Sequence, residues 1–123
     1  MKRYIFFAIF LLCLSLGLYL TIESKSNPTK VCFGSNCFLV EVVDTVEKRQ
    51  RGLMFRESLD KNKGMLFVFD GVGEYDFWMK NTLISLDIIW LNENYKVVGV
   101  QTAVPCEAGP CSHYSPNALA QYV

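Results

Sequence analysis

The chain has 123 residues, of which 51% are hydrophobic and 14% are aromatic. Its 12 basic and 12 acidic residues give a net charge of zero. From Val31 onward, however, the chain has 8 Lys and Arg and 11 Asp and Glu, a net charge of −3 (8 − 11). A mildly acidic domain without a basic stripe argues against nucleic acid as the partner, and the aromatic content argues against intrinsic disorder. Removing the first 30 residues leaves 93 (123 − 30), enough for one small domain.

The first 22 residues have the composition of a membrane-directed segment. Lys2 and Arg3 precede an almost unbroken apolar run at residues 4–22, which would span roughly 28 Å as a helix, close to the thickness of a bilayer core. The basic flank predicts that the N-terminus stays in the cytoplasm and that the rest of the chain crosses the membrane. Residues 1–22 are therefore predicted to be a signal anchor. A signal peptide cleaved near residues 15–17 or 24–26 is one alternative, and a buried core helix is another.

Residues 23–30 are polar and contain Pro28, which is typical of a tether between a membrane and a folded domain. Residues 31–123 then form a single domain. The predicted orientation places this domain outside the cytoplasm, in the periplasm or on the outer face. It is either anchored to the cytoplasmic membrane through residues 4–22 or secreted.

The predicted domain contains four cysteines in two C-x4-C pairs, Cys32 with Cys37 and Cys106 with Cys111. Export to an oxidising compartment predicts that these thiols form disulfides. The Gly34-Ser35 step between the first two suits a type II′ hairpin turn, which brings Cys32 opposite Cys37, and a Gly-Pro step turns the chain within the second pair. A zinc site of four thiolates and a redox-active pair are the alternatives.

The remaining pattern predicts several short strands and one helix. Asp44 and Thr45 are candidate N-caps for a polar helix over 46–55, and residues 56–63 form a charged loop. A glycine-containing turn is expected at 70–74, and a loop pinned by the second cysteine pair at 105–117. Many short strands with one helix are typical of a small β-sandwich or barrel. The predicted strands are 37–43, 64–69, 75–79, 83–91, 95–104 and 118–123.

Three sequence blocks carry a resemblance to a known family. They are Thr45-x-Glu-x-Arg-x-Arg-Gly-Leu-Met54, Gly64-Met-Leu-Phe-x-Phe69 and Phe77-Trp-Met-Lys-Asn-Thr-x-Ile-x-Leu-Asp-Ile88, with a weaker Pro105-Cys…Pro-Cys111…Tyr114. The region 31–123 resembles the domain-of-unknown-function 192 family, also called uncharacterised protein family 0127. The resemblance implies a mainly β, jelly-roll-like fold with one short helix, frequent export or membrane attachment, and no established activity.

The chain departs from the family pattern in three places. Ser85 stands where the family usually has Pro, and Val46 where Pro often begins the helix. Family members also continue beyond residues 121–123, so we expect the last strand to be incomplete and its edge exposed.

The most suggestive candidate ligand-binding group is Trp78, Lys80, Asn81 and Asp87. Along a strand Trp78 and Lys80 share one face, with Met79 on the other. An aromatic face beside a cation and an amide suits a small polar or anionic ligand. The competing interpretation is structural: Trp78 lies in the core, Lys80 forms an ion pair with Asp87, and Asn81 holds a turn.

Arg49 and Arg51 on the predicted helix form either a solvated face or an anion or partner site. Met54, Met65 and Met79 are spread over separate elements, which favours core packing over a copper site. No metal, cofactor or catalytic residue is predicted.

The resulting hypothesis is a membrane-tethered, non-enzymatic binding or accessory module of the cell envelope. Its partner is the membrane together with a small polar or anionic ligand or an envelope protein. One alternative is a small hydrolase or lyase using His113, Asp87 and Lys80, which requires a deep pocket that places His113, Asp87 or Glu74 near Lys80. The other is a structural envelope-interaction protein, which an exposed aromatic patch would favour.

Overall fold

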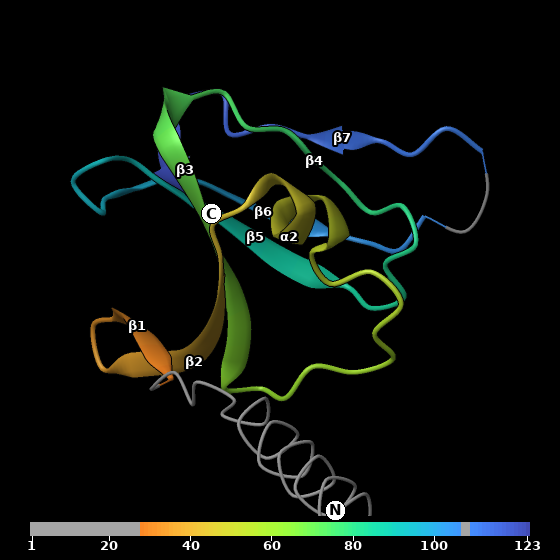
Figure 1. Cartoon of the computed structure of the whole chain (residues 1–123), viewed down its shortest axis with the longest axis horizontal. Helices are drawn as coiled ribbons and strands as arrows, with labels where there is room; N and C mark the ends of the chain where they lie inside the picture. Colours follow the sequence, from red (N-terminus) through yellow and green to blue (C-terminus); the bar gives the residue numbers. More distant parts are fainter. Residues whose placement is uncertain (1–27, 107–108) are drawn as a thin grey trace, which may run out of the picture.

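The computed structural model describes residues 28–106 and 109–123 (Figure 1). The predicted anchor at 1–22 lies outside the described residues, as does most of the predicted tether. Within the two described ranges, no helix is long and apolar enough to cross a bilayer.

Two sheets organise the domain. The larger has six strands in the order β1-β2-β3-β8-β5-β6, and the smaller pairs β4 with β7. Figure 1 shows the β1–β2 hairpin at one end of the domain and the β4–β7 pair along the opposite side. The strands are β1 Thr29–Phe33, β2 Asn36–Val43, β3 Lys63–Gly73, β4 Phe77–Trp78, β5 Leu86–Leu91, β6 Val97–Ala103, β7 His113–Tyr114 and β8 Ala120–Tyr122.

The β1–β2 hairpin forms as its sequence predicts. Gly34 has φ +61°, which suits the first central position of a type II′ turn and favours glycine. The register pairs Phe33 with Asn36 and Cys32 with Cys37. Side chains alternate along the strands, so the two cysteines face solvent while Phe38 points inward and is half-buried.

A parallel pairing of β2 with β3 requires a crossover, which contains the helix α2, Val46–Arg51. Thr45 caps the helix, since its hydroxyl accepts a hydrogen bond from the Lys48 backbone N–H at 3.3 Å. The prediction that the helix reaches residue 55 was wrong. The chain leaves the helix at Gly52, which has φ +46° and whose added Cβ would lie 3.2 Å from the Phe67 ring.

Other boundaries also differ from the sequence prediction. The strand predicted at 64–69 continues through the expected turn to Gly73, with a register irregularity where β8 pairs with it. The strand predicted at 75–79 is reduced to Phe77–Trp78. Its partner β7 lies within the predicted loop 105–117, because a two-residue strand leaves almost no periodic signal. The β5–β6 hairpin is confirmed.

The filled part of the core lies where β5, β6 and β8 meet the residues around β4. Trp90 is fully buried, its indole N–H donates to the Tyr75 carbonyl at 2.9 Å, and Phe77 packs edge-on against it. The other buried members of this cluster are Met79, Ile88, Ala103 and Ala120. The expectation of a mainly β domain with one short helix is confirmed, and the jelly-roll-like sandwich or barrel stays a prediction.

Candidate functional site

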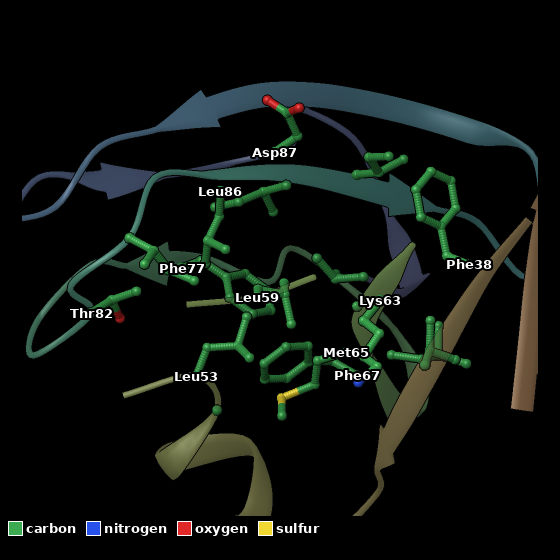
Figure 2. Close-up of a pocket in the computed structure, with 18 of the residues that line it drawn as sticks. Phe38, Leu53, Leu59, Lys63, Met65, Phe67, Phe77, Thr82, Leu86 and Asp87 are labelled. Atoms are coloured by element: carbon green, nitrogen blue, oxygen red, sulfur yellow. The ribbon is translucent and has the colours of Figure 1, made fainter. Parts of the chain in front are cut away.

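A cavity of about 670 Å³ lies beside this core. Its walls come from β1, β2, β3 and β5, from the C-terminal turn of α2, and from the segment that follows the helix. Figure 2 shows Leu53, Leu59, Met65 and Phe67 approaching one another, with Leu86 facing them from β5. The volume falls within the range of small-molecule sites, roughly 300–1,000 Å³.

The cavity walls are mainly apolar but incompletely buried. Val40, Leu53, Leu59, Met65 and Phe67 are all half-buried, in contrast to the fully enclosed cluster around Trp90. Unfilled apolar volume lowers stability, because the lining atoms lose the contacts that close packing provides. The domain therefore has a closely packed core around Trp90 and, beside it, a cavity that its own side chains do not fill.

Residues 52–62, here called the strap, form one wall of the cavity. Two backbone hydrogen bonds hold the strap: Phe55 N–H donates to the Asn81 carbonyl at 2.8 Å, and Leu39 N–H donates to the Asn62 carbonyl at 2.8 Å. Phe55 adopts φ +63° and is 65% exposed, an unusual conformation for a bulky residue. Its ring contributes little to the core, so the strap depends on a small number of local contacts.

An ion pair also fixes the strap to β2. Arg56 donates from both Nη atoms to the Glu41 carboxylate, from Nη2 to Oε2 at 2.8 Å. The hydrogen bond from Arg56 holds the pKa of Glu41 below its ordinary value, and the same bond raises the pKa of Arg56. Directly after the strap, at the start of β3, the Lys63 ammonium lies 2.7 Å from the Asp60 carboxylate and lowers the pKa of Asp60.

Positive charge is concentrated on the cavity lining. Four of the eight Lys and Arg after residue 30 contribute to it, against two of the eleven Asp and Glu. The excess is local, because the domain as a whole carries a net charge of −3. The four cations are Arg49, Arg51, Lys61 and Lys63, and the two acids are Asp60 and Asp87.

The two candidate arginines of α2 have different surroundings. Arg49 Nη1 donates to the carbonyls of Asp44 at 2.7 Å and Val68 at 2.8 Å, and its guanidinium lies over the Phe69 ring at 5.1 Å. These contacts hold the helix against β3, so Arg49 has a structural role whatever else it does. Arg51 is exposed in the last turn and reaches the cavity lining.

The candidate group around Trp78 is only partly brought together. Trp78 is 46% exposed while Met79 is 2% exposed, so the expected alternation of faces is confirmed. Lys80 Nζ lies 5.2 Å from the Trp78 ring centroid, within cation–π range, and the His113 ring lies 6.2 Å from the same indole. Trp78 also contributes to the cavity lining, whereas Lys80 does not.

The other two members of that group serve local structure. Asn81 adopts φ +57°, and its carbonyl accepts from the Phe55 N–H, as expected of a residue that holds a turn. The expected ion pair between Lys80 and Asp87 is wrong. Asp87 is exposed and accepts a hydrogen bond from the Thr102 hydroxyl on β6 at 2.7 Å, because the strand register places the two residues opposite each other. In Figure 2 its carboxylate points away from Leu86 and Leu59.

The residues of the hydrolase hypothesis have partners on several elements. His113 lies against Trp78, and Asp87 accepts a hydrogen bond from Thr102. Asp76, two residues after Glu74, accepts a hydrogen bond from the Ser115 hydroxyl at 2.6 Å. Among the described residues, no group of three or more His, Cys, Asp and Glu could hold a metal ion.

Both cysteine pairs are bonded in the arrangement predicted from the hairpin and the Gly-Pro turn. Cys32 is joined to Cys37 and Cys106 to Cys111, with Cα–Cα distances of 4.0 Å and 5.6 Å. The disulfides indicate an oxidising, extracytoplasmic environment.

The sequence interpretation missed most of the cavity. Leu53, Leu59, Lys61 and Lys63 were assigned to a helix end and a charged loop without a role. Leu59 was the available signal, because an isolated leucine within the charged segment 56–63 indicates that the loop covers an apolar surface.

These features define a class: a mainly β domain with two short disulfide loops and an apolar cavity beside its core. The chain belongs to the DUF192 family, described as an uncharacterised ACR, whose model matches residues 29–123. No curated protein matches the chain.

Two solved structures are similar to this domain. A protein of unknown function from Novosphingobium aromaticivorans DSM 12444 aligns with a TM-score of 0.68 at 28% identity, over 83% of this chain and 76% of that one. A protein from Sinorhizobium meliloti 1021 named a "putative transcription regulator" aligns with a TM-score of 0.63 at 28% identity. That alignment covers 70% of this chain and 65% of the other, so the chain spans slightly less than two thirds of that protein's length.

Proposed function

We propose that the domain is a non-enzymatic binding module of the cell envelope, tethered to the membrane, and that its ligand occupies the apolar cavity. The observation that carries the proposal is the combination of about 670 Å³ of open volume with half-buried apolar walls. A small domain buries only a limited apolar surface, so each apolar side chain matters for its stability. Leaving those of β1 to β3 partly uncovered lowers its stability, and a ligand would restore the missing contacts.

The oxidised cysteines and the partners of the candidate acid and base side chains support a binding role over catalysis. Both cysteine pairs are oxidised, so neither supplies a thiolate nucleophile. The Asp87 and Asp76 carboxylates accept hydrogen bonds from Thr102 and Ser115, and His113 lies beside the Trp78 ring, so these candidate acid and base side chains have structural partners.

The cavity replaces the Trp78–Lys80–Asn81 surface as the leading ligand site. Asn81 holds a turn and the Lys80 ammonium lies over the Trp78 ring, so this surface offers one exposed ring and one cation. The cavity provides a partly enclosed, mainly apolar volume of ligand size, with Trp78 contributing to its wall.

The test is photolabelling of the full chain, reconstituted in phosphatidylcholine nanodiscs, with a small apolar aryl-diazirine. We expect label in the tryptic peptides 64–80 and 81–96, which contain most of the strand walls, and little in 97–123. Leu59→Trp fills the cavity and should remove the label. Val100→Trp is the matched control, since Val100 is 60% exposed on β6 and lies outside the lining. Equal labelling of the two variants would refute the proposal.

A further inference from the structure

We propose that the ligand of the cavity is an anionic amphiphile, with its apolar tail inside and its carboxylate or phosphate head at the strap wall, beside Arg51 or Lys61. This inference rests on the proposed function and adds the chemical class of the ligand. Two independent observations carry it: the hydrogen-bonding state of the interior and the distribution of charge on the lining.

The buried part of the wall offers little for a polar ligand to bind, because the polar residues Gln50, Ser58 and Ser85 of the lining are exposed. Among the described residues, no buried side-chain nitrogen or oxygen lacks a hydrogen-bond partner. Thr82 is the buried polar residue of the wall, and its hydroxyl donates to the Lys80 carbonyl at 3.4 Å. A polar group placed inside would lose its water contacts without replacement, so the enclosed part of the ligand is apolar.

The lining nevertheless carries an excess of positive charge. Its four cations and two acids give a local charge of +2 (4 − 2) in a domain whose net charge is −3. Asp60 is paired with Lys63, and the Asp87 carboxylate is turned away toward Thr102. The Lys63 ammonium offsets the charge of Asp60, and the Asp87 carboxylate points away, so the repulsion that these acids exert on an anion at the lining is weakened.

Two of the four cations remain for a ligand. The Arg49 guanidinium is held by two backbone carbonyls, and Lys63 by Asp60. Arg51 and Lys61 are exposed, and neither side chain has a hydrogen bond or ion pair with another described residue. Arg51 ends α2 directly before the strap and Lys61 lies near the end of the strap, so this wall carries one cation near each of its ends. An anionic head at this position stays partly hydrated while its tail is enclosed, as an amphiphile requires.

The experiment uses the full chain in phosphatidylcholine nanodiscs with three diazirine probes of equal chain length: hexadecanoate, hexadecanol and hexadecylamine. We expect hexadecanoate to label peptides 64–80 and 81–96 at least about five-fold more than hexadecylamine, with hexadecanol between them. Unlabelled hexadecanoate should compete with this labelling. A fourth arm, a diazirine phosphatidylglycerol, distinguishes an acyl chain held by a lipid from a free fatty acid, and both fall within the proposed class.

Charge reversal tests the position of the head group. The double variant Arg51→Glu/Lys61→Glu should lower hexadecanoate labelling at least about five-fold and leave hexadecanol labelling unchanged. Lys96→Glu, in the β5–β6 turn and outside the lining, should change neither. Equal cavity labelling by all three probes, or a preference for the amine, would overturn this inference and leave the binding function standing. Failure of every probe to label the cavity would overturn the binding function itself.

Discussion

Arg56 donates hydrogen bonds from both Nη atoms to the carboxylate of Glu41, a residue 15 positions earlier in the chain. The pair joins the strap to β2 and therefore closes one wall of the cavity. Its side chains are partly exposed, 35% for Arg56 and 56% for Glu41, so its contribution to global stability is limited by solvent screening.

Removing this pair should loosen the strap more than it destabilises the domain. Arg56→Ala is expected to lower the free energy of unfolding by about 1 kcal/mol or less, because exposed ion pairs contribute no more than that. Tryptic cleavage after Lys61 should become faster, since one of the strap's few attachments is lost. Arg56→Lys retains the charge and should have a smaller effect. Cleavage at an unchanged rate in Arg56→Ala would mean that the backbone hydrogen bonds alone hold the strap.

The same pair predicts an acid-dependent loss of stability. Arg56 lowers the pKa of Glu41 in the folded state, so the contribution is fully present above the pKa that glutamate has in the unfolded chain. It is lost as the pH falls through the lowered folded pKa. Urea unfolding between pH 6 and pH 2 should show a smaller acid loss in Glu41→Gln than in the wild type. Asp44 and Asp60 also have lowered pKa values, so some acid dependence remains in the variant. Glu57→Gln, an exposed glutamate in the strap, is the control and should retain the wild-type profile.

Non-reducing tryptic mapping should find both disulfides within single peptides. Cys32 and Cys37 lie in the peptide 31–48, and Cys106 and Cys111 lie in 97–123. Each peptide should run 2 mass units below its reduced form, and the two should not be cross-linked. A covalent 31–48/97–123 species would establish a different pairing. Cys32→Ser/Cys37→Ser should cost about 2 kcal/mol, the chain-entropy value for so short a loop.

Lys80 and Asp87 should behave as independent positions. Lys80 stacks on Trp78 and Asp87 bonds to Thr102, so neither mutation leaves the other residue unpaired. Lys80→Ala and Asp87→Asn should each lower the free energy of unfolding by about 1 kcal/mol or less, and the double variant should show their sum within about 0.5 kcal/mol. Chemical denaturation of the three variants measures this. A shared, non-additive loss of about 3–5 kcal/mol would instead indicate a buried ion pair.

The predicted anchor can be tested on the natural protein. Lys2, Arg3 and the apolar run 4–22 predict that the chain stays with membranes through alkaline carbonate extraction. Replacing Leu11 and Leu12 with Arg should release it or block export, since charges near the centre of such a segment are costly. A mature form beginning after Gly17 or Ser26 would show that the segment is cleaved.

The local features of this domain could be predicted from the sequence because they depend on neighbouring residues. Gly34 and Ser35 define a two-residue turn, and that turn alone places Cys32 opposite Cys37. Thr45 begins the helix for a similarly local reason. The period of two along a strand separates exposed Trp78 from buried Met79.

The tertiary structure decided what depends on contacts between distant segments. The parallel pairing of β2 with β3, the short strand β7 and the Asp87–Thr102 bond follow from strand register, which composition does not encode. The cavity has the same origin. Leucines of the strap, aromatic residues of β2 and β3, and the inner face of β5 enclose a volume that exists only once all of them are placed. A sequence specifies which side chains are apolar, but whether they fill a space or surround it depends on the spacing of the elements that carry them.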